Sequence, residues 1–212
     1  MPSVYPDETK GDAMTQTTMV DLAPAADAVA GLLPGITEEQ LSWPTPCADT
    51  SVAALLDHFT GLALAFTWAA TKETVPEQAG QRPGPGAASA ADLDPDWRRL
   101  LPTRLEALVE AWRDPAAWTG MTQAGGVELP GEVAGVVALT ELVLHGWDLA
   151  RATGQDLACD PDTAQAVFRH VSQFASREGT PGLFGPMVDV PSDRPILDRA
   201  VGLSGRDPDW TP

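Results

Sequence analysis

The sequence of 212 residues has few cysteines, few histidines and little positive charge, and each shortage excludes something. Its two cysteines, Cys47 and Cys159, cannot build a disulfide framework or a thiolate metal cluster, so we interpret both as free thiols of a reducing compartment. No stretch reaches the ~18 uninterrupted apolar residues that span a bilayer, and the N-terminus lacks the basic-then-apolar order of a signal peptide. We therefore expect a cytoplasmic protein without a membrane partner.

Positive charge is scarce throughout the chain. Lysine and arginine number 13 against 30 aspartates and glutamates, which gives a formal net charge of −17. A field of this sign repels phosphate backbones and anionic headgroups, so we expect neither nucleic acid nor a membrane surface as a partner. Apolar residues are abundant instead: 43% hydrophobic with 20% charged is the composition of a globular protein with a packed core.

The apolar residues recur mainly at helical spacing, and no strong strand pairing is visible. The pattern predicts an all-α protein, with a bundle of four main helices followed by a fifth helix and a tail. The expected helices cover residues 19–33, 51–71, 96–113, 132–153 and 160–178. The fourth is apolar over much of its circumference, so we place it in the centre of the bundle.

Helix boundaries carry their own signals. Thr37 and Gln40 have the spacing of a capping box before a short helical turn. Asp160 followed by Pro161 is an N-cap with proline at the first helical position, and Gly154 suits a helix C-cap.

We expect one domain with loose segments. Residues 1–18 are polar and unpatterned, which predicts a flexible extension before a single domain at 19–212. Residues 73–95 contain Pro, Gly and Ala without a period and predict an exposed, mobile loop, and Gly125-Gly126 marks another loop. The Pro- and Gly-rich tail predicts an extended strap across the bundle, with one short helix at 193–203.

Two of the three histidines lie inside the apolar helical pattern. His58 follows Leu55 by three residues and precedes Leu62 by four, so it points to the core side of its helix. His145 follows Glu141 by four residues, which places the carboxylate and the imidazole on one helix face roughly 6 Å apart. A buried carboxylate is costly unless a cation compensates it, and no lysine or arginine lies within one turn of Glu141.

Two interpretations fit the spacing of these three residues. A His, Glu, His set is the usual protein share of a metal site with an open position, and a bundle easily combines an i, i+4 pair with a ligand from another helix. Equally, Glu141 and His145 fit an intrahelical hydrogen bond with His58 as a core histidine, because Glu-x-x-x-His is a loose pattern. The spacing alone does not choose between them.

Several segments resemble a known family. They are TPC at 45–47, LLDH at 55–58, ELVLHGWDLARATG at 141–154 and DRAVGLSGRDP at 198–208. With these segments the chain resembles the actinobacterial metal-binding branch of the DinB-like superfamily, which includes the N-terminal domain of mycothiol-dependent maleylpyruvate isomerase. The resemblance covers nearly all of the chain after about Met19. Thr50 departs from it, since relatives often carry tryptophan at that position.

The resemblance implies a DinB-like four-helix bundle in which His58, Glu141 and His145 bind one divalent metal ion. Zinc is the first candidate, and nickel, iron or manganese suit the same ligands. The resemblance also implies mycothiol as a co-substrate, so that the partners are a small-molecule thiol and an electrophilic small molecule; a homodimer stays open. We expect the isomerase's additional C-terminal domain to be absent.

Three functional hypotheses follow. The first is a metal-dependent thiol S-transferase or isomerase, in which a cation with an open position stabilises a thiolate; its catalytic residues are unassigned. The second is a metal-assisted hydrolase, for which Asp148 is the general base nearest in sequence. The third is a non-catalytic metal- or ligand-binding protein, which a fourth ligand such as His170 would favour.

The remaining polar residues near these motifs have plainer interpretations. Asp148 and Arg151 fit two interpretations equally well: contacts to the metal ligands or to a substrate, or an i, i+3 ion pair on one helix. Cys47 fits a small buried residue of a Pro-rich loop better than a reactive thiol near the site. His170 fits a surface or partly buried histidine better than a metal ligand.

Overall fold

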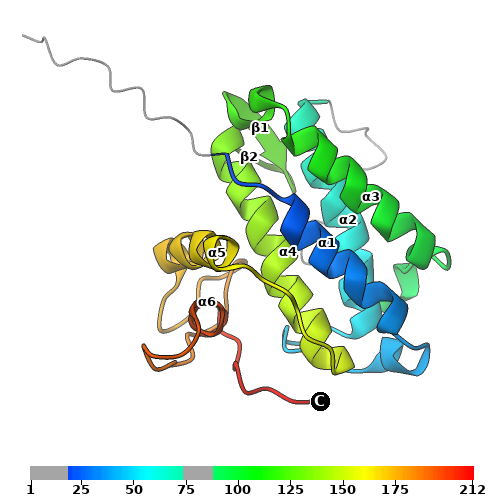
Figure 1. Cartoon of the computed structure of the whole chain (residues 1–212), viewed down its shortest axis with the longest axis vertical. Coiled ribbons are helices and arrows are strands. Elements are labelled where there is room, and N and C mark those ends of the chain that lie inside the picture. The colour runs from blue at the N-terminus through cyan, green and yellow to red at the C-terminus, as the bar shows by residue number, and fades with distance from the viewer. Residues whose placement is uncertain (1–18, 74–87) are drawn as a thin grey trace, which may run out of the picture.

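The structure is a computed structural model that describes residues 19–73 and 88–212. Within these residues, four helices form the bundle: α1 (Ala23–Leu32), α2 (Val52–Thr71), α3 (Trp97–Trp112) and α4 (Gly131–Thr153). Helix α2 packs against α3 and α4, and α1 packs against the same two, so the four make a closed square (Figure 1). The prediction of a mostly helical four-helix bundle is confirmed.

Helices α2 and α4 form the apolar centre of the bundle. Ser51 caps α2 by accepting a hydrogen bond from the backbone N–H of Ala54, and Gly154 ends α4 in a left-handed conformation with φ 70°. By length and composition both helices could also cross a membrane, but 67% and 72% of their apolar windows are buried inside the protein. Their apolar character is therefore accounted for by packing in the bundle.

A pair of tryptophans locks the end of the bundle where α4 begins. Trp118, in the short 3-10 helix η4 (Pro115–Trp118), packs edge-to-face on Trp112 with ring centroids 5.0 Å apart. The indole N–H groups of Trp112 and Trp118 donate to the carbonyls of Phe66 and Trp112. A Cβ on Gly135 would lie 2.4 Å from the Trp118 ring, so this glycine lets α4 approach closely. The contacts fix α4 beside α2, the arrangement on which the site depends.

A β-hairpin between α3 and α4 corrects the expectation of a plain loop. Strands β1 (Met121–Ala124) and β2 (Val127–Pro130) pair antiparallel, and Gly125 and Gly126 form the turn with φ values of 58° and 82°. Positive φ at both central residues is the geometry of a tight hairpin turn, for which two glycines are well suited. The strands are only four residues long each, and for this reason their alternation did not stand out.

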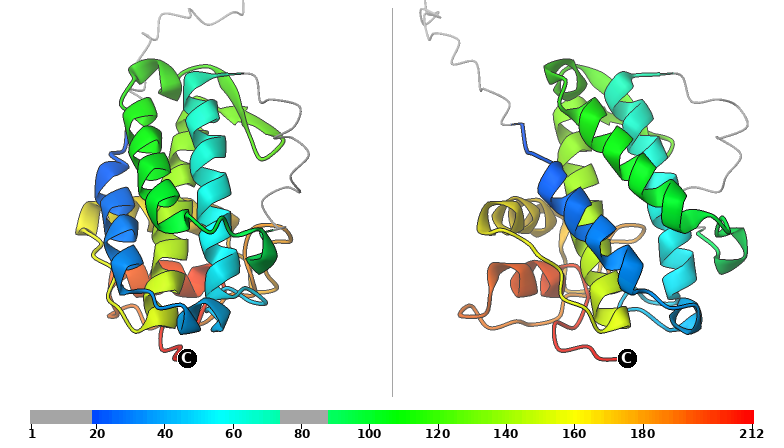
Figure 2. Two further views of the ribbon diagram at one scale, coloured as in Figure 1. Left: turned by 90° about the vertical axis from the view of Figure 1, so that its right-hand side faces the viewer. Right: turned by 45° about the vertical axis from the view of Figure 1, so that its right-hand side comes forward.

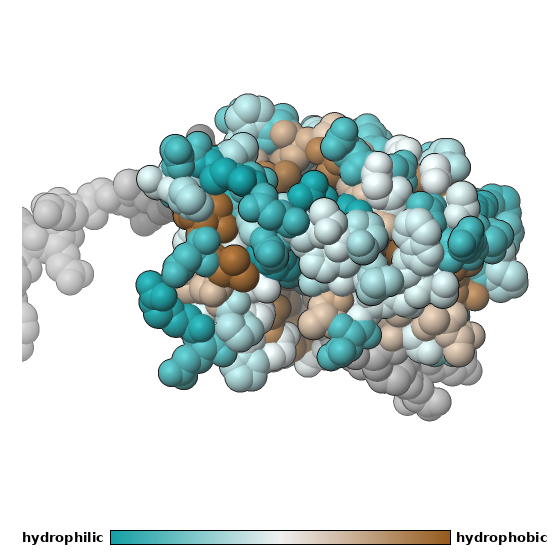
Figure 3. Space-filling model, turned by 90° about the horizontal axis from the view of Figure 1, so that it is seen from below, coloured by the Kyte–Doolittle hydropathy of each residue, from teal (hydrophilic) through white to brown (hydrophobic). Residues whose placement is uncertain are grey.

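The C-terminal part forms a second, smaller layer. Helix α5 (Pro161–Phe174) packs against α4, and α6 (Ile196–Leu203) packs against α5. Both lie across the half of α4 that leads to its C-terminal end (Figures 1 and 2). Hydrophilic and hydrophobic residues are interspersed on the molecular face seen from below (Figure 3). The predicted strap is thus partly a helical layer, joined by extended chain that is bonded to α6 through Val188 and Gly202.

Other boundary predictions have mixed outcomes. The capping box is confirmed, since Thr37 and Gln40 exchange hydrogen bonds between side chain and backbone N–H. The Asp160 N-cap is confirmed as well. Helix α5 ends at Phe174, earlier than expected, because Ala175 adopts an extended conformation. The predicted extension at 1–18 and most of the predicted loop at 73–95 lie outside the described residues; residues 90–92 of that loop form a short 3-10 helix.

Candidate metal centre

The side-by-side packing of α2 and α4 brings the three predicted ligands together. Oε2 of Glu141 lies 3.2 Å from Nε2 of His58 and 3.2 Å from Nε2 of His145. His58 comes from α2, whereas Glu141 and His145 are one turn apart on α4, as their spacing predicted. The two imidazole rings meet edge-to-face with centroids 4.7 Å apart. Three donor atoms from two helices therefore converge on one point.

The donor separations suit a metal ion. All three donor atoms lie within 4.8 Å of one another. Ligands bonded at about 2.0–2.2 Å around a tetrahedral zinc are about 3.3–3.6 Å apart, close to the 3.2 Å contacts seen between nitrogen and oxygen. Two imidazoles and one carboxylate are also the donor types that zinc and its neighbours in the first transition row accept. The residues fit the group without rearrangement of the helices.

The centre is open on one side. The His58 and His145 side chains are 12% and 14% exposed, whereas the Glu141 side chain is 32% exposed. Among the residues that the structure describes, no fourth histidine, cysteine, aspartate or glutamate joins these three donors. Glu141 is therefore the one of the three donors whose side chain is most exposed to solvent.

The other face of His145 is closed by a buried ion pair. Nδ1 of His145 lies 3.0 Å from Oδ2 of Asp148, whose side chain is fully buried. Arg206, from the turn after α6, donates through Nε to Oδ1 and through Nη2 to Oδ2, both at 2.8 Å. Of the two interpretations of Asp148, the ion pair with Arg151 is not formed, because the guanidinium of Arg151 turns to the Pro208 carbonyl and the ring of Trp147, whereas the contact with a predicted ligand, His145, is present.

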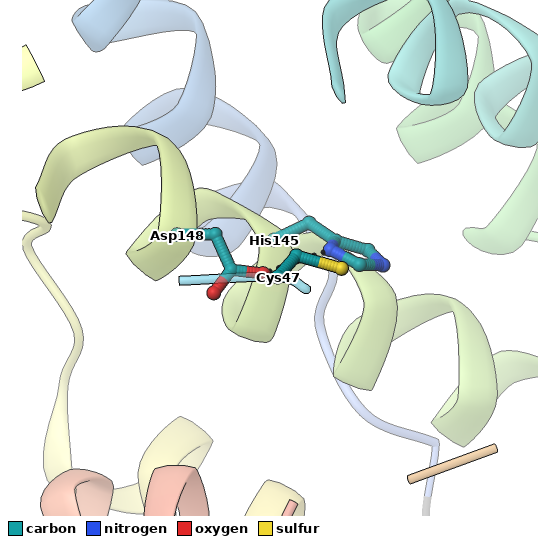
Figure 4. Close-up of side chains that lie close together, drawn as sticks. All are labelled: Cys47, His145 and Asp148. Carbon is teal, nitrogen blue, oxygen red and sulfur yellow. Dashed lines mark hydrogen bonds and ion pairs between the residues drawn. The ribbon is translucent and has the colours of Figure 1, made fainter. Parts of the chain in front are cut away.

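Cys47 lies beside this closed face. Its sulfur, a nitrogen of His145 and a carboxylate oxygen of Asp148 lie within 4.8 Å of one another, which makes a second group of metal-capable side chains (Figure 4). The residue is partly buried in the loop before α2, and the hydroxyl of Thr50 donates to its sulfur at 3.7 Å. Arg206 already neutralises Asp148, so a cation in this second group would be repelled by the guanidinium.

Electrostatics reinforce the polar network of His145. Burial disfavours the charged form of Glu141, but hydrogen bonds and charges from His145 and His58 outweigh burial and hold the pKa of Glu141 well below its usual range. Burial alone would lower the pKa of His145; Asp148 and Glu141 outweigh it and raise that pKa to about 10. A metal ion at Nε2 of His145 would therefore displace the proton that Nε2 carries in the metal-free protein.

In the ion pair of Asp148 and Arg206, too, the charge of the partner outweighs the effect of burial on each pKa. Burial opposes ionisation of Asp148, yet the charge of Arg206 and the hydrogen bond from His145 leave the pKa of Asp148 lowered. For Arg206, burial is outweighed by Asp148, so its pKa is raised above the ordinary value. Both groups are thus charged at every physiological pH. Asp148 has both oxygens engaged and cannot take up a proton from a substrate.

His170 stands apart from the centre. It lies on α5 with its ring 5.2 Å from that of Phe174, and burial lowers its pKa while the charge of Glu141 opposes the shift. It is partly buried, as its plainer interpretation predicted, and it does not join the three converging donors.

Arg206 is a member of the site that the sequence patterns did not predict. Its segment, DRAVGLSGRDP, was noticed only as part of a resemblance. Asp148 and Arg206 are 58 residues apart, and no periodicity connects residues at that distance. The available signal was electrostatic: a second carboxylate in the apolar α4 requires a cation, and a distant arginine can supply it.

Two relatives of known sequence match this chain. Two proteins of Mycobacterium tuberculosis, the uncharacterized protein Rv0738 of strain ATCC 25618 / H37Rv and the uncharacterized protein MT0763 of strain CDC 1551 / Oshkosh, are each 29% identical to this chain over 197 residues. Each match covers 86% of this chain and 93% of the relative. They carry no activity over to this protein.

Solved structures with the same fold are enzymes that use a thiol. The crystal structure of mycothiol-dependent maleylpyruvate isomerase matches with a TM-score of 0.59 and 16% identity, and that of a histidine-to-alanine mutant matches with a TM-score of 0.60 and 18% identity. Each match covers 89% of both chains. That coverage does not support the expectation that a whole additional C-terminal domain of the isomerase is absent here. At these identities the likeness shows the fold alone.

The family is shown by the sequence itself. The sequence model of the Mycothiol maleylpyruvate isomerase N-terminal domain matches residues 22–150, more than half of the chain. The matched region runs from the start of the bundle to the end of the HGWDLA segment and includes all three converging donors. The chain therefore belongs to the mycothiol maleylpyruvate isomerase N-terminal domain family, within the DinB-like helical fold.

Proposed function

We propose that this protein binds one divalent metal ion through Nε2 of His58, Oε2 of Glu141 and Nε2 of His145. The observation that carries the proposal is the pair of 3.2 Å contacts from Glu141 Oε2 to the two imidazole nitrogens. Zinc is the first candidate because its preferred bond lengths reproduce these separations; nickel, iron and manganese are the alternatives.

We further propose that the protein is a metal-dependent thiol S-transferase or isomerase with a mycothiol-type thiol as co-substrate. When bound, the ion supplies Lewis acidity that stabilises a thiolate at neutral pH. The partial exposure of the Glu141 side chain supports approach of a small thiol and an electrophilic small molecule from that side. Membership in a family named after a mycothiol-using isomerase supports the choice of thiol.

The charges around the centre favour an anionic ligand. Glu141 contributes one negative charge, and the pair of Asp148 and Arg206 is neutral overall. A divalent ion held by one carboxylate and two neutral imidazoles therefore keeps one net positive charge. A thiolate neutralises that charge, whereas a neutral thiol does not, so the surroundings lower the pKa of a bound thiol.

The two alternative functions fit the geometry less well. Hydrolysis needs a general base beside the nucleophilic water, and Asp148, the nearest in sequence, is fully buried with both oxygens bound to Arg206 and His145. A closed, non-catalytic site needs a fourth protein ligand. Among the described residues His170 does not provide one.

Metal binding is tested by elemental analysis of the purified protein. We expect about one equivalent of metal in the wild type and almost none in His145→Ala, because that substitution removes one of three ligands. His170→Ala is the matched control: it removes a histidine of the same protein that lies outside the donor group, and it should keep the metal. Equal metal contents in His145→Ala and the wild type would refute the proposed site.

Thiol binding is tested on cobalt-substituted protein. Addition of mycothiol should produce a sulfur-to-cobalt charge-transfer band, and consumption of the thiol with small electrophiles should depend on the metal. A metal-loaded protein whose cobalt spectrum ignores mycothiol and simpler thiols, while turning over an ester or amide, would favour hydrolysis instead.

A further inference from the structure

Arg206 is the residue of the C-terminal part that reaches the candidate metal centre. It is only 9% exposed and lies outside residues 22–150, the part matched by the family. Its guanidinium binds Asp148 with two parallel hydrogen bonds of 2.8 Å, and Nη1 donates to the Ser204 hydroxyl at 3.1 Å. Such a bidentate pair fixes the position and plane of the carboxylate, which a single hydrogen bond does not.

The backbone that carries Arg206 is itself held tightly. Gly205 has φ 88°, and a Cβ there would lie 2.6 Å from the backbone of Gly185. The Gly185 N–H donates to the Ser204 carbonyl, and the Arg206 N–H donates to the Val201 carbonyl. Two segments of the tail therefore cross in direct backbone contact, immediately before the arginine. The guanidinium is aimed by a rigid turn.

The arginine acts on the centre mainly through Asp148; its own Nη2 lies 3.5 Å from Nδ1 of His145, at the limit of a hydrogen bond. Oδ2 of Asp148 accepts from Nδ1 of His145 at 3.0 Å, so the Nδ1 proton is fixed on the closed face. Nε2 is then the nitrogen whose lone pair is available to a metal, and it is the nitrogen that faces Glu141 and His58. A carboxylate behind a ligating histidine sets the tautomer and ring orientation in this way.

We propose that Arg206 is a positioning residue of the metal centre: by holding Asp148, it keeps His145 in the orientation and tautomer that present Nε2 to the metal. The inference rests on the metal site proposed above. It makes the C-terminal layer of α5, α6 and the following turn a working part of the centre, although the three ligands all belong to the bundle.

The test compares metal affinity in three variants of the full chain. Dissociation constants for Zn²⁺ and Co²⁺ are measured by competition with a chelator. Arg206→Met should weaken binding by roughly 10–100-fold, the usual range for loss of an outer partner of a ligand. Arg206→Lys, which keeps the charge but loses the bidentate geometry, should fall between Arg206→Met and the wild type. The ligand-field bands of bound cobalt should shift away from their wild-type positions, more in Arg206→Met than in Arg206→Lys.

Arg194→Met is the matched control. Arg194 lies in the same tail and pairs with Asp198 and Asp209 at the protein surface, away from the donor group. Arg194→Met removes an arginine that also forms ion pairs, but none of its partners contacts the three donors. The metal affinity of Arg194→Met should therefore equal that of the wild type. A general loosening of the tail would weaken Arg194→Met and Arg206→Met alike and would overturn a specific role for Arg206.

A second measurement does not depend on the variants folding. In ¹⁵N-labelled, zinc-loaded wild type, the ring nitrogens of His145 should show a protonated Nδ1 and a metal-bound Nε2. A protonated Nε2 with the metal on Nδ1 would overturn the inference, as would wild-type affinity and spectra in Arg206→Met. If the wild type binds no metal, the proposed function fails and the inference with it; if it binds metal and Arg206→Met is unchanged, only the inference fails.

Discussion

The two faces of His145 differ in what surrounds them. Nε2 faces His58 and Glu141, and the Glu141 side chain is 32% exposed. Nδ1 faces Asp148 and Arg206, whose side chains are 0% and 10% exposed. The open face, at Nε2, is partly exposed and presents donors for a cation. The sealed face, at Nδ1, is buried, and its cation is the guanidinium of Arg206. One imidazole can thus be held rigidly from behind while its working nitrogen stays accessible.

The largest expected effect comes from breaking the sealed face. Asp148→Ala leaves the buried guanidinium of Arg206 without its carboxylate, and removal of one partner of a buried pair costs about 3–5 kcal/mol. Urea denaturation should show this loss in the free energy of unfolding. Asp209→Ala is the control, because its pair with Arg194 is exposed and should contribute far less. Similar losses in both variants would mean that the two faces differ less than the structure indicates.

A change on the open face should spare the fold and remove the metal. Glu141→Gln keeps the size of the side chain but removes the charge between the two imidazoles. We expect metal affinity to fall by more than about 100-fold, beyond the range of an outer partner, because a ligand itself is lost. The free energy of unfolding of the metal-free protein should fall less than in Asp148→Ala, because the Glu141 side chain is partly exposed whereas that of Asp148 is fully buried. Isothermal titration with Zn²⁺ and urea denaturation measure the two effects.

Substitution of Cys47 tests which face of His145 holds the cation. Cys47→Ser should change the dissociation constant for Co²⁺ by less than about threefold, because the sulfur lies on the sealed face and Arg206 repels a cation there. The cobalt-substituted wild type, without added thiol, should then lack a sulfur-to-cobalt charge-transfer band. A band that is present in the wild type without added thiol and absent from Cys47→Ser would place the metal on Cys47, His145 and Asp148 instead.

The smallest effect concerns Cys159, the free cysteine that is not part of either group of metal-capable side chains. Burial, assisted by the charge of Asp160, raises the pKa of Cys159 to about 11. In Cys47→Ser, alkylation of Cys159 should be slow at neutral pH and accelerate about tenfold per pH unit up to that value, because only the thiolate reacts. A rate that levels off near pH 9 would show an ordinary, solvated thiol.

Local signals in the sequence predicted the parts of the protein that depend on neighbouring residues. The i, i+4 spacing of Glu141 and His145 and the helical position of His58 predicted that these side chains face the core, and the structure brings them together. The capping box at Thr37 and the N-cap at Asp160 also act within a few residues. That they bind a metal stays a prediction.

The features that sequence reasoning missed depend on distant or short elements. The i, i+3 spacing suggested Arg151 as an ion-pair partner of Asp148, whereas the partner in the structure, Arg206, comes from a different layer. The hairpin was missed because its four-residue strands are too short to show a period, although Gly125-Gly126 alone was a usable turn signal. Long-range pairing has no periodicity to read, so it required the fold.

The separation of Asp148 and Arg206 also sets an order of events during protein synthesis. Arg206 follows Asp148 by 58 residues, and at about 5–20 residues per second a ribosome needs roughly 3–12 s to add them. During that interval the bundle helices have been made, but the carboxylate has no guanidinium to meet. Asp148 can already accept a hydrogen bond from Nδ1 of His145 during that interval, but its carboxylate lacks the bidentate partner that fixes its plane, so the sealed face is complete only after residue 206 has been made.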